Sequence, residues 1–181
     1  FLGATYFRML GQNQRYGASA RGLAINSGEP DAKEEFPAFT EWWLGKPEKD
    51  VKTLRLYAIL DSPSCAGAYE FLFRPGPTTV ADVTAVLFLR TNSMKTLGLV
   101  PLTSMYWFGE NSEGKPNDYR SEVHDSDGLL VRTGEDDFLW RPISNPKSLR
   151  RQTFALNTFR GFRSEEHTSE LQSRFGISYA V

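Results

Sequence analysis

The sequence has 181 residues, of which 40% are hydrophobic and 24% are charged, as is typical of a folded globular domain or part of one. Its 21 basic and 22 acidic residues are interspersed and leave a formal net charge of -1, so we expect neither nucleic acid nor a membrane surface as a partner. No apolar run approaches the roughly 20 residues of a transmembrane helix, which argues against membrane insertion. One cysteine and two histidines exclude a disulfide scaffold and a structural zinc module, and we expect no metal and no cofactor.

Two strands are expected in the first quarter of the chain. Residues 20–25 form a short apolar run of the kind found in strands. Residues 39–44 are rich in aromatic side chains and are followed by the Lys46-Pro47 pair. Because proline cannot donate to a sheet ladder, residues 39–44 are predicted to form an edge strand that ends there.

From residue 52 the pattern becomes that of an antiparallel meander. Residues 52–58 alternate in polarity with the period of a strand, and residues 68–73 resume as a second strand after a turn rich in Asp, Ser and Pro. A Pro-Gly-Pro turn leads into a third strand, residues 80–89, which alternates at first and is then continuously apolar. That change predicts a strand that enters the middle of a two-sided core.

The last third of the chain contains a second hairpin. Residues 129–132 and 138–141 flank the turn at 134–137, and a further strand is expected at 105–108. We find no amphipathic helix longer than two turns and no internal repeat. Many short strands with Gly and Pro turns predict an all-β fold, an antiparallel β-sandwich.

The two ends of the chain do not resemble natural termini. The sequence begins at Phe1 without an initiator methionine or a leader, and it ends without a closing signal, so we expect a sandwich that is truncated at both ends. Missing partner strands would leave sheet edges bare. We therefore expect residues 1–162 to aggregate when expressed alone, and a cooperative unfolding transition would contradict this.

Residues 163–181 are expected to be a non-native tail. Residues 163–173 correspond to one reading frame of a common sequencing-library adapter, and residues 177–181 match its next constant stretch in the same frame. The alternative is a polar helix, because Ser-Glu-Glu at 164–166 is typical of a helix start. Without the tail, His124 is the only histidine.

The densest polar cluster is the connection at residues 119–128, which precedes the second hairpin. An EF-hand is excluded, because Leu130 occupies the position that needs glycine and no helices flank the loop. Glycosidic acid and base chemistry needs two separated carboxylates, so Asp125 or Asp127 could supply one of them with its partner elsewhere. The alternative is an Asx-type turn that begins a strand. A Ser-His-Asp triad would have to use His124, but no nucleophile elbow is present.

Aromatic side chains provide candidate platforms for the apolar faces of sugar rings. Each of them could equally belong to a core or its rim. These residues are Tyr6, Tyr16, Trp42, Trp43, Trp107 and Trp140.

Four segments in order along the chain carry a family resemblance: residues 1–8, 16–24, 102–105 and 122–129. They are similar to the osmoregulated periplasmic glucan biosynthesis proteins, types G and D, and the resemblance covers residues 1–162. It implies a bacterial periplasmic protein with a large N-terminal β-sandwich, similar to galactose mutarotase-like carbohydrate domains, followed by a small immunoglobulin-like domain. Residues 1–162 would be the central part of that sandwich.

The resemblance also implies a substrate and a reaction. The family acts on the β-1,2-linked glucose backbone of periplasmic glucans, and type D members resemble an inverting β-1,2-glucanase that uses two aspartates. The loop at residues 124–128 matches the region of the base, whereas the general acid belongs to a later segment. This chain alone would then be inactive.

The candidate site residues follow from the loop and the resemblance together. An inverting enzyme needs a base that takes a proton from water at a distance from the acid. The catalytic candidates are Asp125 and Asp127, with a preference for Asp125. Supporting or proton-relay positions are His124, Ser126 and Tyr119, and candidate glucan contacts are Tyr16, Arg21 and Trp107.

A rival hypothesis is a non-catalytic protein that binds the nascent glucan and hands it to a membrane-bound glucan synthase. A purely structural β-domain is the third alternative. The acidic loop and the aromatic content argue against that last reading.

Overall fold

The computed structural model describes residues 1, 3–13, 17–99, 101–114, 116–134, 137–155 and 159–165. All regular structure in these ranges is β-strand, and the strands pair in antiparallel fashion. The expected all-β class is therefore confirmed. Over the same ranges, no helix has the length and apolarity needed to cross a bilayer.

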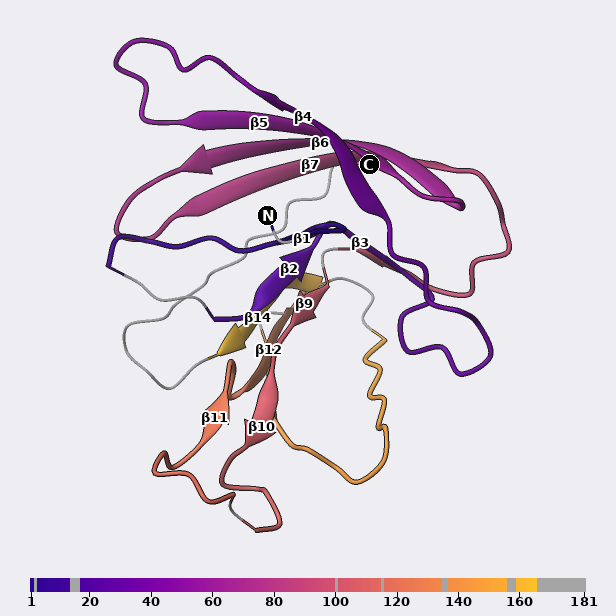
Figure 1. Ribbon diagram of the computed structural model, residues 1–181, viewed down its shortest axis with the longest axis vertical. Helices are drawn as coiled ribbons and strands as arrows, with labels where there is room; N and C mark the ends of the chain where they lie inside the picture. The colour runs from indigo at the N-terminus through magenta and orange to yellow at the C-terminus, as the bar shows by residue number, and fades with distance from the viewer. Residues whose placement is uncertain are drawn as a thin grey trace.

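The largest unit is a four-stranded sheet in the order β4-β5-β6-β7 (Figure 1). Its strands are β4 (Ala38–Leu44), β5 (Leu54–Asp61), β6 (Cys65–Arg74) and β7 (Val80–Leu89). Successive strands are neighbours, so the predicted meander is confirmed. β4 lies at one edge, as the proline after it indicates.

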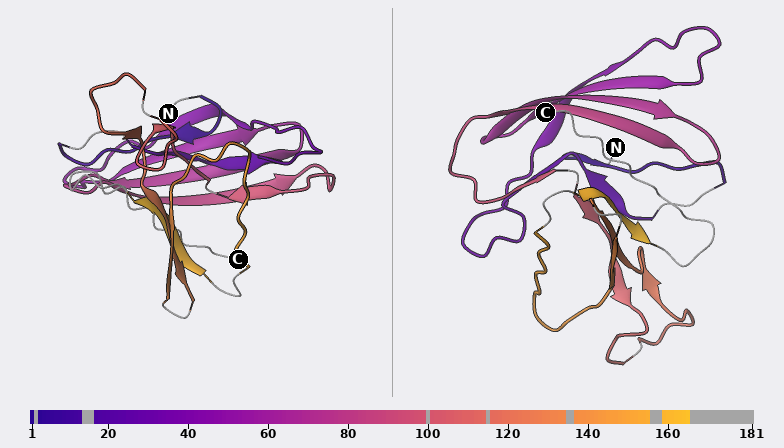
Figure 2. Two further views of the ribbon diagram at one scale, coloured as in Figure 1. Left: turned by 90° about the horizontal axis from the view of Figure 1, so that it is seen from below. Right: turned by 180° about the vertical axis from the view of Figure 1, so that it is seen from behind.

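The remaining strands of the described residues are 2 to 7 residues long and form four small sheets. These are β1 (Tyr6–Phe7), β2 (Ser19–Arg21) and β9 (Leu102–Thr103); β3 (Leu23–Ile25) and β8 (Leu97–Leu99); β10 (Tyr106–Phe108) and β11 (Val123–His124); and β13 (Phe138–Pro142), β12 (Gly128–Thr133) and β14 (Phe159–Glu165). The predicted second hairpin is the β12–β13 pair. β10 to β12 extend away from the four-stranded sheet, and the same separation is visible from behind (Figure 2).

The strand expected at residues 20–25 is divided in two at Gly22. The Gly22 N–H donates to the Thr5 carbonyl at 2.9 Å, and its carbonyl accepts from the Tyr69 hydroxyl at 2.9 Å. A Cβ at this position would lie 2.8 Å from the Phe39 ring. Glycine therefore lets the chain pass close beneath the large sheet while it moves from one small sheet to the next.

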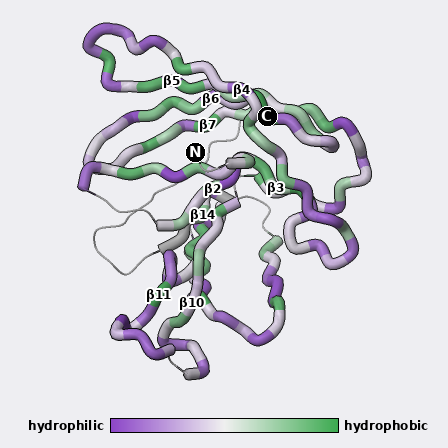
Figure 3. Tube along the Cα trace, in the orientation of Figure 1, coloured by the Kyte–Doolittle hydropathy of each residue, from purple (hydrophilic) through white to green (hydrophobic). Residues whose placement is uncertain are grey.

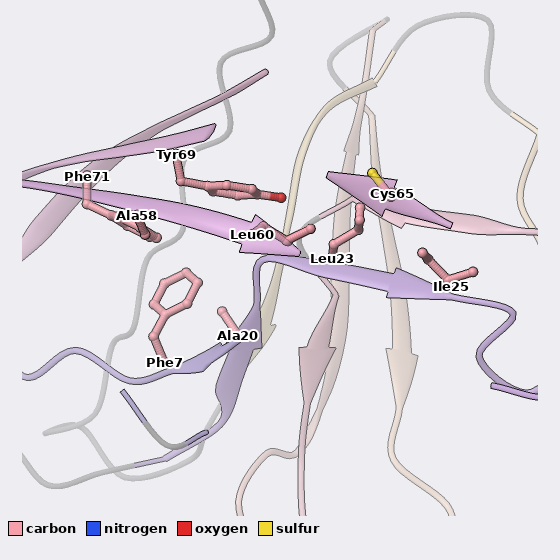
Figure 4. Close-up of a cluster of buried hydrophobic side chains, with 9 residues drawn as sticks. All are labelled: Phe7, Ala20, Leu23, Ile25, Ala58, Leu60, Cys65, Tyr69 and Phe71. Carbon is pink, nitrogen blue, oxygen red and sulfur yellow. The ribbon is translucent and has the colours of Figure 1, made fainter. Parts of the chain in front are cut away.

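The hydrophobic core lies between the four-stranded sheet and the layer formed by β1 to β3 (Figure 4). Phe71 is fully buried at its centre, with ring centroids 5.4 Å from Phe7 and 5.9 Å from Phe39. The buried cluster consists of Phe7, Ala20, Leu23, Ile25, Ala58, Leu60, Cys65, Tyr69 and Phe71. Two sheets packed face to face are the arrangement of a β-sandwich. The finer likeness to galactose mutarotase-like domains stays a prediction.

The expectation that residues 80–89 enter a two-sided core is wrong. In the described residues β7 pairs only with β6, and Phe88 is 62% exposed. Phe88 and Val86 point to the face of the sheet opposite the core, whereas Leu87 between them packs against the core. The apolar run therefore has one exposed face.

Part of the expected tail continues a strand. Residues 163, 164 and 165 belong to β14 and pair with Leu130, Leu129 and Gly128 of β12. Residues 166–181 lie outside the described residues. The origin of residues 163–181 stays a prediction.

Candidate functional site

The polar loop surrounds the short β10–β11 pair, in a part of the chain with strongly hydrophilic segments (Figure 3). His124 pairs with Tyr106 across these strands, and a register shift follows before Phe108. The chain then runs through residues 125–127 and enters β12 at Gly128. Residues 124–127 are therefore held between two antiparallel pairs.

The imidazole of His124 lies between two carboxylates. Its Nε2 is 3.0 Å from Glu122 Oε2, and its Nδ1 is 3.7 Å from Asp127 Oδ1. The ring stacks on Tyr106 with centroids 5.7 Å apart and planes 12° apart, so the His124 side chain is only 9% exposed. The Glu122 contact is within hydrogen-bond distance, whereas the Asp127 contact is a longer electrostatic one. The three side chains, Glu122, His124 and Asp127, are called the histidine cluster below.

Asp125 and Asp127 have different environments. The Asp125 N–H donates to the Met105 carbonyl at 2.9 Å, and Asp125 Oδ2 accepts the Met105 N–H at 3.0 Å. This pair of bonds ties the loop to the residue before β10. Asp127 instead directs Oδ1 toward His124, its side chain is 15% exposed, and its carbonyl accepts the Ile143 N–H at 2.6 Å.

Ser126 points to a different feature, a cavity of about 380 Å³. Its buried hydroxyl donates to Ser104 Oγ at 2.6 Å. Both serines line the cavity, together with Arg141 and Arg150, whereas Asp125 and Asp127 do not. The loop therefore presents its carboxylates and its serine to separate surroundings.

Tyr119 and Trp107 lie outside the histidine cluster. Tyr119 is 97% exposed, and Trp107 is half exposed. The Arg120 guanidinium carbon is 5.7 Å from the Trp107 ring centroid, and Arg120 Nε and Nη2 donate to the two Asp118 oxygens at 2.9 and 2.6 Å. These hydrogen bonds lower the pKa of Asp118 to about 2. Arg120 thus covers part of the ring that was expected to contact a sugar.

Arg21 is buried rather than presented to solvent. It is 3% exposed, its Nη1 donates to Glu34 Oε1 at 2.8 Å, and its guanidinium carbon lies 5.0 Å from the ring centroids of Tyr6 and Phe36. Its Nε and Nη2 have no acceptor within the described residues. Tyr16, the other candidate contact in this part of the chain, is outside the described residues. The glucan-contact roles of both residues stay predictions.

Sequence reasoning missed Glu122 and the two cavity arginines. Glu122 directly precedes β11 and lies two residues before His124, and side chains at that spacing point to the same face of an extended chain. That spacing would have placed Glu122 beside the imidazole. No comparable local signal brings Arg141 and Arg150 to Ser126. Across the described ranges, no group of three or more His, Cys, Asp or Glu side chains could hold a metal ion.

Comparisons with known proteins agree with the motifs. The family model described as periplasmic glucan biosynthesis protein, MdoG, matches residues 1–167. Glucans biosynthesis protein G of Pseudomonas aeruginosa is 51% identical over 162 residues, covering 90% of this chain and 30% of the relative. Glucans biosynthesis protein D 1 of Ralstonia nicotianae is 50% identical over 175 residues, covering 90% of this chain and 32% of the relative.

A third relative extends the match along this chain. Glucans biosynthesis protein G of Rhodopseudomonas palustris is 46% identical over 183 aligned residues, covering 98% of this chain and 36% of the relative. The chain thus spans about a third of the length of the curated relatives it matches, which include both G and D types. The chain belongs to the MdoG family of periplasmic glucan biosynthesis proteins.

Proposed function

We propose that this chain supplies the base side of a periplasmic site that hydrolyses or remodels a β-1,2-linked glucan. The family supports a role in glucan biosynthesis, and the periplasm is the compartment that its description names. The histidine cluster is the observation that carries the catalytic part of the proposal. It places a partly exposed carboxylate against a buried imidazole whose other nitrogen faces a second carboxylate.

In the proposed reaction, Asp127 takes a proton from the attacking water. The water oxygen forms a bond to the anomeric carbon while the glycosidic C–O bond breaks, and a general acid from outside this chain protonates the leaving oxygen. His124 Nδ1 faces Asp127 Oδ1 at 3.7 Å and helps to position this carboxylate. Glu122 orients the imidazole from its other side.

Asp125 has a different role in this proposal. Its carboxylate and its N–H are both engaged by Met105, so it fixes the loop on which Asp127 is carried. The geometry therefore favours Asp127 over Asp125 as the base. Trp107 and Tyr119, which lie close in sequence to this loop, offer exposed aromatic surface for contacts with the glucan.

The test uses a chimera in which the aligned segment of this chain replaces the matching 162 residues of the Pseudomonas aeruginosa protein. Purified chimera is incubated with linear β-1,2-glucan, and new reducing ends are counted. We expect Asp127→Asn to lower turnover by about 10²- to 10⁴-fold, the usual range for a general base, with glucan binding unchanged. Asp118→Asn is the matched control, because Asp118 is paired with Arg120 outside the cluster.

Two results would contradict the catalytic proposal. One is that Asp127→Asn retains full turnover. The other is that Asp118→Asn lowers turnover as much as Asp127→Asn does. If Asp125→Asn alone removed activity, the roles of the two loop aspartates would be exchanged.

The second candidate function is glucan binding and transfer without catalysis, in association with a membrane-bound glucan synthase. The burial of His124 favours it, because a 9% exposed imidazole offers little room for a proton relay to solvent. A chimera that binds β-1,2-glucan but produces no reducing ends would support this alternative. Co-purification with the synthase would then identify the recipient.

A further inference from the structure

We propose that the cavity beside Ser126 binds an oxyanion, a carboxylate or phosphate group. The cavity has a volume of about 380 Å³ and lies among β9, the loop, β12, the end of β13 and the segment that follows it. It is called the arginine pocket below. This inference is independent of the proposed catalysis, because it concerns residues that the histidine cluster does not use.

The charge of the arginine pocket is one-sided. Arg141 and Arg150 line it, and among the described side chains no Asp or Glu does so. Ser104, Ser126 and Gln152 add neutral polar groups. Neutral sugars are commonly held by acceptors as well as donors, whereas two guanidinium groups without a carboxylate favour a negatively charged occupant.

Arg141 is held in place before any ligand arrives. Its Nη1 donates to the Trp140 carbonyl at 2.8 Å, and its guanidinium carbon lies 4.8 Å from the Phe154 ring centroid. A guanidinium has five N–H donors, so one bond to a carbonyl leaves its fork available to an oxyanion. Because the side chain is already oriented, less conformational entropy is lost on binding.

The segment that carries Arg150 is anchored at two points. The Ile143 N–H donates to the Asp127 carbonyl at 2.6 Å, and Arg151 bonds to Glu29 and to the Gly28 carbonyl. Arg150 lies between these two anchors and lines the pocket. An oxyanion in the pocket would lie next to Ser126 and Gly128, the residues on either side of Asp127. The side chains of the histidine cluster do not line the pocket.

The experiment measures binding of glucose 6-phosphate, glucose and inorganic phosphate by calorimetry at low salt. It uses the chimera described above, because residues 1–162 alone are expected to aggregate. We expect glucose 6-phosphate to bind at least about tenfold more tightly than glucose, with an affinity that falls as salt rises. If inorganic phosphate binds as tightly as glucose 6-phosphate, the pocket is a site for free anions. If inorganic phosphate binds more weakly, the pocket recognises an anionic group on a sugar.

Charge-neutral variants locate the site. Arg141→Gln and Arg150→Gln should each weaken glucose 6-phosphate binding about tenfold, and Arg141→Lys should weaken it less because the charge is kept. Arg74→Gln is the matched control, because Arg74 is on the four-stranded sheet and pairs with Asp82. If Arg141→Gln does not fold, Arg150→Gln still decides the question, since Arg150 is exposed. The proposal would be overturned if glucose and glucose 6-phosphate bound equally well or if neither bound. It would also be overturned if Arg74→Gln weakened glucose 6-phosphate binding as much as the pocket variants do.

Discussion

The four-stranded sheet and the region from β10 to β14 are built from different interactions. Strands β4 to β7 are 7 to 10 residues long, and their inner face is held by a continuous aromatic and aliphatic core. Strands β10 and β11 are 3 and 2 residues long. They are held by side-chain hydrogen bonds around His124, Asp125 and Ser126.

This difference separates stability from candidate chemistry. Apolar burial gives the large sheet most of its free energy, and that contribution does not depend on protonation. The loop region depends on carboxylates, an imidazole and arginines, which are the groups that can transfer protons or bind anions. We therefore expect substitutions in the two regions to differ in kind as well as in size.

The largest effect is expected in the sheet core. Phe71→Ala should destabilise the segment by about 3 to 5 kcal/mol, because it removes a fully buried ring that packs against Phe7 and Phe39. Hydrogen exchange of β5 to β7 in the chimera measures the change. Phe88→Ala is the control, because Phe88 points away from the core and should cost less than about 0.5 kcal/mol. A similar cost for both would mean that another part of the protein covers the outer face.

Much of the sheet region could be predicted because its strands follow a period of two. Residues 52–58, 68–73 and 80–89 were assigned to strands, and β5, β6 and β7 include them nearly completely. The division at Gly22 could not be predicted, because it results from the approach of Tyr69 and Phe39, which are distant in sequence. The exposure of β7 was also missed, since an apolar run does not reveal which face is covered.

The location of the polar loop could be predicted from the sequence, but the contacts of its side chains could not. The density of polar residues at 119–128 located the loop, and residue spacing placed His124 near its aspartates. The contrast between Asp125 and Asp127 depends on Met105 and on the β10–β11 register, which no local pattern specifies. Arg141 likewise lines the same cavity as Ser126 because β12 pairs with β13.

The next largest loss of stability is expected at Gly128, where the loop region is closely packed. A Cβ there would lie 2.4 Å from the Arg141 carbonyl oxygen and 2.5 Å from the Trp140 ring. Because one neighbour is backbone, Gly128→Ala should separate β12 from β13 and cost about 3 kcal/mol, the upper part of the range for overpacking. Hydrogen exchange of β12 and β13 in the chimera measures this. Gly161→Ala in the adjacent β14 has no atom within 4 Å of the new Cβ and should be nearly neutral.

A smaller change in stability, which differs between the two partners of one ion pair, is expected at Arg21 in β2. Glu34→Ala should cost about 1 to 3 kcal/mol, because it leaves a buried guanidinium without its carboxylate. Arg21→Met should cost less, because it also removes two donor nitrogens, Nε and Nη2, that have no acceptor within the described residues. Thermal midpoints of the chimera variants give the comparison. If Arg21→Met were the more damaging change, Arg21 would have a partner or ligand that outweighs its burial.

The smallest expected effect is a pH dependence of stability that comes from the Asp118–Arg120 ion pair in the loop region. Hydrogen bonds from Arg120 hold the pKa of Asp118 at about 2, below its ordinary value of 3.8. A lowered folded-state pKa means that this pair stabilises the fold above about pH 4, and that the contribution is lost as the pH falls toward 2. NMR titration of carboxyl carbons in the chimera should find this pKa, with Asp118→Asn assigning the signal. Arg120→Gln should return it toward 3.8 and leave Trp107 more exposed, whereas an unchanged pKa would show that Arg120 does not hold this carboxylate in solution.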